Sequence, residues 1–192
     1  LIKIVMKIVL SRLPLGYALW RRLNLFRHGG MDNHRYSLDI FEHHVGKYLD
    51  LDNLKGKTIL ELGPGDSAAT GVLNAAHGGT TILVDVGAFA VTDVGFYREL
   101  NEFLRANGKR AISLDGVGQF DDLLHATNTK YHTNGLASLK AIPTDSVDFI
   151  FSQAVLEHVR RHEFEDVSRE LHRILKPGGI ASHRIDFKDH LG

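Results

Sequence analysis

The stretch Thr58-Ile59-Leu60-Glu61-Leu62-Gly63-Pro64-Gly65-Asp66-Ser67 decides the fold of this chain. Its first half is an apolar run that predicts a buried strand ending in an acid. Its second half predicts a glycine turn that leads into a helix. Closely spaced glycines at such a turn let the backbone approach a ligand where a Cβ would clash. The stretch is therefore typical of a nucleotide-binding turn.

A second strand ends in a carboxylate farther along the chain. The segment Thr80-Thr81-Ile82-Leu83-Val84 is β-branched and apolar, and Asp85 follows it. Asp85 lies about twenty residues after the glycine turn, the spacing at which nucleotide-binding folds place the acid that holds the hydroxyls of a ribose. The two strands together indicate a nucleotide-type cofactor.

The rest of the chain is expected to alternate between strands and helices. A helix capped by Ser37 and running to Leu49 comes first. Later strands are expected near 131–133, 146–152 and 180–185, with helices near 67–76, 96–107, 120–126 and 161–175. Such alternation implies parallel strands joined by right-handed crossovers. We predict an α/β fold with three layers, in which helices flank a doubly wound, mostly parallel sheet.

The chain of 192 residues suits one domain with a lead-in. Residues 1–54 are expected to form a helical lead-in with basic and aromatic side chains, and residues 55–192 the cofactor-binding core. The apolar segment 1–10 is interrupted by lysines and is shorter than the ~20 residues that a membrane span requires. We expect it to cap the core, and the alternative is peripheral contact with a membrane surface.

Composition excludes several classes of function. Lys+Arg and Asp+Glu both total 23, so the charge balance indicates no nucleic-acid partner. Because the chain has no cysteine, disulfides, thiolate metal ligands and cysteine nucleophiles are excluded, and we expect a cytoplasmic location. No metal site is predicted, since the spacing of His183, Asp186, Asp189 and His190 matches no compact ligand motif. The oligomeric state stays open.

Three later stretches, taken with the first, resemble class I S-adenosylmethionine-dependent methyltransferases. They are IPTDSVDFIFS at 142–152, QAVLEHV at 153–159 and LKPGG at 175–179, and Glu61 at the end of the first strand belongs to the same pattern. The resemblance covers about residues 55–186. It implies a Rossmann-like fold with seven strands and S-adenosylmethionine as the cofactor. The chain stops near the end of the fifth strand, so we expect a fragment that lacks the last strands.

The resemblance also implies which residues bind the cofactor. The glycine turn brings its backbone against the cofactor, and an acid at the end of the first strand reaches toward the methionine ammonium. A carboxylate accepts hydrogen bonds from both ribose hydroxyls. Val86 packs on the adenine, Asn134 and Gly135 meet its amino edge, and Ser152 and Gln153 lie beside the sulfonium. The full set of residues that the resemblance assigns to the cofactor is, in chain order, Glu61, Gly63, Pro64, Gly65, Asp85, Val86, Asn134, Gly135, Ser152 and Gln153.

The implied reaction is in-line transfer of a methyl group to a small-molecule or saccharide acceptor that the sequence does not identify. If the acceptor is a hydroxyl, a base assists, and His158 and His183 are the candidates. The other histidines, including His43 and His44, are expected to face solvent or to be satisfied locally. Because residues 63–68 also satisfy G-x-G-x-x-A, an NAD-dependent oxidoreductase is the first alternative. A catalytically degenerate cofactor-binding or scaffold domain is the second.

Overall fold

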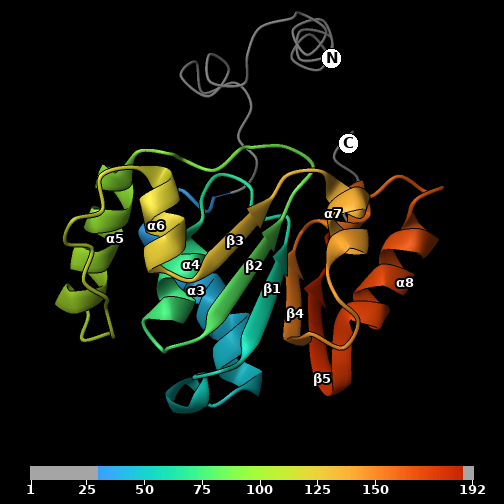
Figure 1. The fold of residues 1–192 in the computed structure, drawn as a ribbon, viewed down its shortest axis with the longest axis horizontal. Helices are drawn as coiled ribbons and strands as arrows, with labels where there is room; N and C mark the ends of the chain where they lie inside the picture. Colours follow the sequence, from blue (N-terminus) through green and yellow to red (C-terminus); the bar gives the residue numbers. More distant parts are fainter. Residues whose placement is uncertain (1–29, 188–192) are drawn as a thin grey trace, which may run out of the picture.

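A computed structural model of the protein describes residues 30–187 (Figure 1). Five strands form one sheet in the order β3-β2-β1-β4-β5, and every neighbouring pair is parallel. This arrangement confirms the predicted doubly wound, Rossmann-like α/β fold. The strands are β1 (Thr58–Leu62), β2 (Thr80–Val84), β3 (Thr129–His132), β4 (Val147–Gln153) and β5 (Leu175–Arg184).

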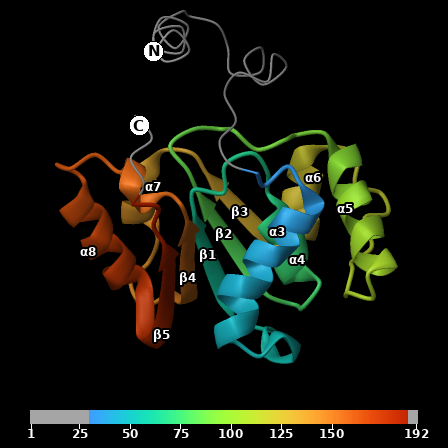
Figure 2. The same ribbon diagram turned by 180° about the vertical axis from the view of Figure 1, so that it is seen from behind.

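Helices cover both faces of the sheet. On one face lie α3 (His34–Phe41), α4 (Ala69–Ala75), α5 (Val94–Ala106) and α6 (Phe120–Ala126), as Figure 2 shows from behind. On the other lie α7 (Gly135–Ala141) and α8 (Phe164–Ile174). A π-helical turn η1 (Glu42–Gly46) and two 3-10 turns, η2 (Leu51–Asn53) and η3 (Leu156–His158), complete the elements.

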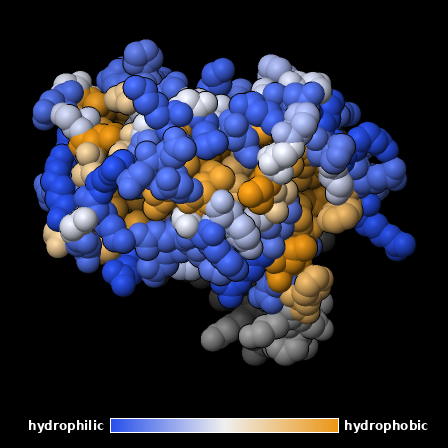
Figure 3. Space-filling view, turned by 90° about the horizontal axis from the view of Figure 1, so that it is seen from below, coloured by the Kyte–Doolittle hydropathy of each residue, from blue (hydrophilic) through white to orange (hydrophobic). Residues whose placement is uncertain are grey.

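The apolar strands separate two cores. Successive side chains of a strand point to opposite faces, so Ile59 of β1 joins the core under α3 and α4 while Leu60 joins the core under α7 and α8. Phe149 of β4 lies in the first core and Ile150 in the second. Strands buried on both faces read as nearly continuous apolar runs, which is why these two segments are easily found in the sequence. Seen from below, a band of hydrophobic residues crosses the middle of the molecule between hydrophilic ones (Figure 3).

The first helix begins earlier than the sequence predicts. Asn33 caps it, because its Oδ1 accepts a hydrogen bond from the backbone N–H of Tyr36 at 3.0 Å. Ser37 is buried inside the helix and donates its hydroxyl to the carbonyl oxygen of Met31 at 2.7 Å. The prediction of a cap at Ser37 was therefore wrong, since Asn and Ser are comparable caps and Asn33 comes first. The helix continues into η1, where the backbone widens to a π-helical turn.

The remaining elements match the predictions with two exceptions. The helix at 120–126 is confirmed, and α5 and β4 differ from their predicted bounds by one or two residues. Helix α7 was not predicted, because the Asn134-Gly135 pair at its start is typical of a turn. β5 begins at Leu175 rather than at 180, and the segment 176–179 forms an irregularity within the strand, where the register with β4 shifts between Val147 and Phe149.

Several expectations concern residues outside 30–187. The apolar segment 1–10, with its alternatives of core cap or membrane contact, lies outside the described residues, as do Asp189 and His190. Within the described part of the chain, no helix is both long and apolar enough to cross a membrane.

Candidate functional site

The predicted site residues converge on one edge of the sheet. β1 lies between β2 and β4. From β1 the chain continues to β2 and β3 on one side, and it then crosses back to form β4 and β5 on the other side of β1. Ligands of doubly wound sheets bind at this edge, where the strand order reverses. The glycine turn follows β1, Asp85 follows β2, and Gln153 ends β4. The structure therefore gathers residues that are far apart in the sequence.

The glycine turn has the backbone that only glycine adopts readily. Gly63 and Gly65 have φ angles of 73° and 62°, and Pro64 between them is buried. The N–H of Gly63 donates to the carbonyl oxygen of Val84 at 2.8 Å and so ties the turn to β2. A Cβ at Gly63 would lie 2.5 Å from Cγ2 of Val155. The nearness of the Val155 side chain is therefore a second reason, besides the φ angle, for glycine at this position.

Asp85 links the glycine turn to the end of β2. Its Oδ2 accepts a hydrogen bond from the N–H of Gly65 at 3.0 Å, and its Oδ1 accepts one from the N–H of Val86 at 2.7 Å. These two contacts fix the orientation of the carboxylate, which is 9% exposed. Because each carboxylate oxygen has a further lone pair, Asp85 is able to accept a hydrogen bond from each hydroxyl of a ribose.

Glu61 is buried at the carboxyl end of β1. Burial raises the pKa of its carboxyl to about 8; the Thr70 hydroxyl opposes this rise and the negative charge of Asp85 adds to it. No group among the described residues forms a hydrogen bond with its Oε2, although the side chain is only 1% exposed. A buried carboxyl oxygen without a hydrogen bond is costly, so the site fits a ligand that brings a cation or a hydrogen-bond donor to Oε2.

The residues predicted to hold adenine lie together. Val86 exposes 77% of its surface, and a Cβ at Gly135 would lie 3.1 Å from its Cγ1. The N–H of Gly135 donates to the carbonyl oxygen of Asp85 at 2.8 Å, which fixes the start of α7 beside the end of β2. The N–H of Asn134 donates to the Ser138 hydroxyl at 3.0 Å. An exposed apolar side chain next to a residue without a side chain offers a surface on which a flat ring is able to pack.

The two candidate bases have different surroundings. His183 of β5 is half-buried, and its Nδ1 lies 2.8 Å from Oγ of Ser152, which is fully buried. Burial, together with the neighbouring His44, lowers the pKa of the His183 imidazole below its usual value. His158 lies on η3 and is exposed. The structure thus orients His183 by a buried hydroxyl at the site.

His44 is a site residue that the sequence analysis missed. It lies in η1, is 1% exposed, and stacks on Phe151 with a ring-centroid distance of 5.1 Å. Its Nδ1 lies 2.8 Å from Oγ of Ser182, and its Nε2 lies 3.2 Å from Oε1 of Gln153. The expectation of solvent or local contacts was wrong for His44, because its partners come more than a hundred residues later. The helical spacing from Phe41 places it on the buried face, and this signal was available.

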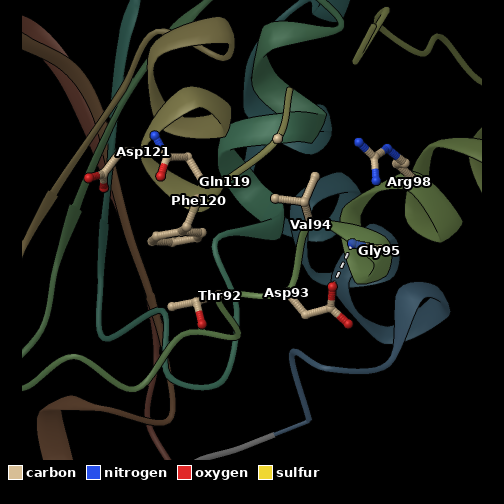
Figure 4. Close-up of a pocket in the computed structure, with 9 residues that line it drawn as sticks. Thr92, Asp93, Val94, Gly95, Arg98, Gln119, Phe120 and Asp121 are labelled. Carbon is tan, nitrogen blue, oxygen red and sulfur yellow. Dashed lines mark hydrogen bonds between the residues drawn. The ribbon is translucent and has the colours of Figure 1, made fainter. Parts of the chain in front are cut away.

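An open cleft of about 510 Å³ lies between the first turns of α5 and α6. Figure 4 shows Phe120, Val94 and Thr92 around it, and Asp93 turned toward Gly95, whose N–H it accepts at 2.9 Å. No residue predicted for the cofactor lines it. In the described chain, no three histidine, aspartate or glutamate side chains gather closely enough to hold a metal ion.

The chain is similar to one family in sequence. A family model described as "Methyltransferase domain" matches residues 60–182. This span contains all five strands almost completely and every residue predicted to bind the cofactor. No curated protein matches the chain.

Several solved structures are similar to the chain. One is the PH0226 protein of Pyrococcus horikoshii OT3, with 17% identity and a TM-score of 0.42 over 79% of this chain and 58% of that one. Another is a SAM-dependent methyltransferase of Archaeoglobus fulgidus, with 13% identity and a TM-score of 0.42 over 86% and 57%. A third is the DhpI-SAM-HEP complex, with 16% identity and a TM-score of 0.40 over 92% and 69%. The chain thus spans less than two thirds of the first two proteins.

Proposed function

The chain belongs to the methyltransferase-domain family, whose cofactor is S-adenosylmethionine, and we propose that it methylates a hydroxyl of a small polar molecule or a saccharide. The observation that supports a cofactor site is the buried Glu61, whose Oε2 has no hydrogen bond among the described residues, beside the glycine turn and Asp85. This arrangement leaves one place for a cationic group and an adjacent place for a diol.

The residues at the sheet edge fit the parts of this cofactor in order. Glu61 is suited to the ammonium of the methionine part, Asp85 to the ribose hydroxyls, and Val86 with Gly135 to the adenine. When bound, S-adenosylmethionine supplies an electrophilic methyl group on a sulfonium. The protein contributes the alignment of the acceptor oxygen with that methyl group and the exclusion of water.

We assign the role of base to His183. If its Nδ1–H donates to Oγ of Ser152, Nε2 presents a lone pair for the proton of the acceptor hydroxyl. Nε2 would take the proton of the acceptor hydroxyl as its oxygen receives the methyl group; the bond from that methyl group to the sulfonium would break, and a neutral thioether would leave. The lowered pKa of His183 favours the neutral, basic form at neutral pH.

The acceptor is expected beside the carboxyl ends of β4 and β5, because His183 lies on β5 next to Ser152 of β4. The cleft between α5 and α6 lies at the opposite, β3 end of the sheet (Figure 1) and therefore has no part in this proposal. The test is an incubation with methyl-labelled S-adenosylmethionine and a panel of monosaccharides and small hydroxylated metabolites, followed by identification of the labelled product.

The base assignment predicts a separation of rate from affinity. We expect His183→Ala to lower the turnover number at least about a hundredfold, because a positioned base contributes about 10²–10⁴. The Kd for S-adenosylhomocysteine should stay unchanged, as measured by calorimetry. His158→Ala is the matched control and should keep most of the rate. A loss of rate in His158→Ala with an unaffected His183→Ala would reverse the assignment.

A further inference from the structure

His44 joins the segment before β1 to the ends of two strands. Its ring lies flat on Phe151 of β4, with 24° between the ring planes. Both ring nitrogens have partners, Ser182 on β5 and Gln153 on β4. A π-helical turn carries this histidine, and such turns occur frequently at functional sites. Neither the proposed transfer of the methyl group nor the binding of the cofactor has yet assigned a role to it.

The identity of the partners fixes the proton on the ring. The Oε1 atom of Gln153 is a carbonyl oxygen and only accepts, so Nε2 of His44 carries the proton and donates it. Nδ1 then accepts from the hydroxyl of Ser182. Burial lowers the pKa of His44, which agrees with a neutral ring. The neutral imidazole therefore forms a hydrogen bond with a side chain of each strand.

This hydrogen bond decides which group Gln153 offers to a ligand. Gln153 is the last residue of β4, at the sheet edge where the glycine turn lies. Directly after it the chain turns sharply, because Ala154 has a φ angle of 53° and donates its N–H to the carbonyl oxygen of Arg184 at 2.8 Å. Since Oε1 is held by His44, the two amide N–H donors are left for a ligand, and such donors suit a carboxylate.

We propose that His44 is a positioning residue: by holding Oε1 of Gln153, it presents the side-chain amide to the carboxylate of the cofactor's amino-acid part. This inference rests on the proposed function, because it needs S-adenosylmethionine at this edge. It assigns a task in the binding of the cofactor to the segment before the nucleotide-binding core.

A double-mutant cycle tests the inference, with the Kd for S-adenosylhomocysteine measured by calorimetry. Gln153→Ala should raise the Kd about tenfold, the usual effect of losing a hydrogen bond to a charged group. His44→Phe keeps the stacked ring and removes both nitrogens, and should raise the Kd about threefold or more. The double variant should equal Gln153→Ala alone, because His44 acts through Gln153.

Two control variants separate positioning from general stability. Ser182→Ala removes the other hydrogen bond of His44 without touching Gln153, and should leave the Kd unchanged while lowering the melting temperature. His125→Phe places the same new side chain at an exposed position on α6 and should change neither. Additive effects in the cycle, or an unchanged Kd in His44→Phe, would overturn the inference.

A second measurement needs no variant. The imidazole nitrogen signals of His44 in the wild-type protein should shift when S-adenosylhomocysteine binds, while those of the exposed His125 on α6 stay in place. A bound ligand with unmoved His44 signals would also overturn the inference. If the wild-type protein binds no S-adenosylhomocysteine, the proposed function fails instead, so the two failures are distinguishable.

Discussion

Glu61 and Asp85 lie at the same sheet edge, yet their surroundings differ. Asp85 accepts two backbone N–H groups, which stabilise a charged carboxylate. Glu61 is buried, and its pKa rises to about 8. In the proposed function, Asp85 accepts hydrogen bonds from the ribose hydroxyls. Glu61 pairs with the ammonium of the cofactor, which would favour the ionised form of its carboxyl.

The Glu61 carboxyl makes the stability of the unliganded protein depend on pH. Its pKa rises from 4.5 to about 8 on folding, so the native state keeps a proton that the unfolded chain loses. The free energy of unfolding should therefore fall as pH rises between these values, by about 1.4 kcal/mol per unit. Glu61→Gln keeps the shape and should lack this contribution. Denaturant titrations at several pH values measure it, and equal slopes in both proteins would contradict the assigned burial.

Replacement of Asp85 should weaken binding of the cofactor product. We expect Asp85→Ala to lose about 1–3 kcal/mol of affinity for S-adenosylhomocysteine, because charged hydrogen bonds to the ribose disappear. Asp39→Ala is the matched control, since this aspartate lies exposed on α3 beside Arg35. Calorimetric titration of both variants measures the difference. If the two variants bind alike, Asp85 does not hold the ribose.

Single residues could be predicted where local spacing fixes their role. Asp85 was found from its distance to the glycine turn, and the structure brings the two together through the N–H of Gly65. The role of His44 was not found, because it depends on Gln153 and Ser182, whose positions follow from the order of the strands. Contacts of this kind are set by tertiary packing.

At the scale of elements, the glycine turn and the segment after β4 fit one another closely. Val155 lies over Gly63, so the turn that follows β1 depends on the turn that follows β4. The sequence predicted the glycine turn but not this contact. Helix α7 was not predicted because it begins at an Asn134-Gly135 pair, which is typical of a turn. The segment at 176–179 carries two glycines and a proline, which favour a turn, yet it stays within β5 because Leu175 and Ile180 on either side of it pair with β4.

Two alanine variants separate the backbone from the contact at Gly63. Gly56 has a φ angle of 79° and no atom within 4 Å of an added Cβ, so Gly56→Ala should cost about 1–2 kcal/mol through the backbone alone. Gly63→Ala adds the clash with Val155 and should cost about 2–5 kcal/mol in total. Thermal denaturation measures both. Equal losses would show that Val155 moves aside at no cost.

At the scale of the whole molecule, the described part of the lead-in belongs to the main core. Phe41, Val45 and Leu54 are buried in the same cluster as Ile59 and Phe149. The alternation of strands and helices was sufficient to predict the parallel sheet, because crossovers of one hand leave few other arrangements. The boundary between lead-in and core at residue 54 stays a prediction. Sequence patterns did not reveal that His44 of this segment contacts Gln153 and Ser182 near the carboxyl ends of β4 and β5.

The most direct test of the account is a calorimetric titration of this chain with S-adenosylhomocysteine, with NAD as the control ligand. We expect saturable binding of S-adenosylhomocysteine at one site and no binding of NAD. Circular dichroism of the same sample establishes that the protein is folded. Binding of NAD alone, or binding of neither ligand by the folded protein, would contradict the claim that the edge formed by Glu61, the glycine turn and Asp85 is a methyltransferase cofactor site.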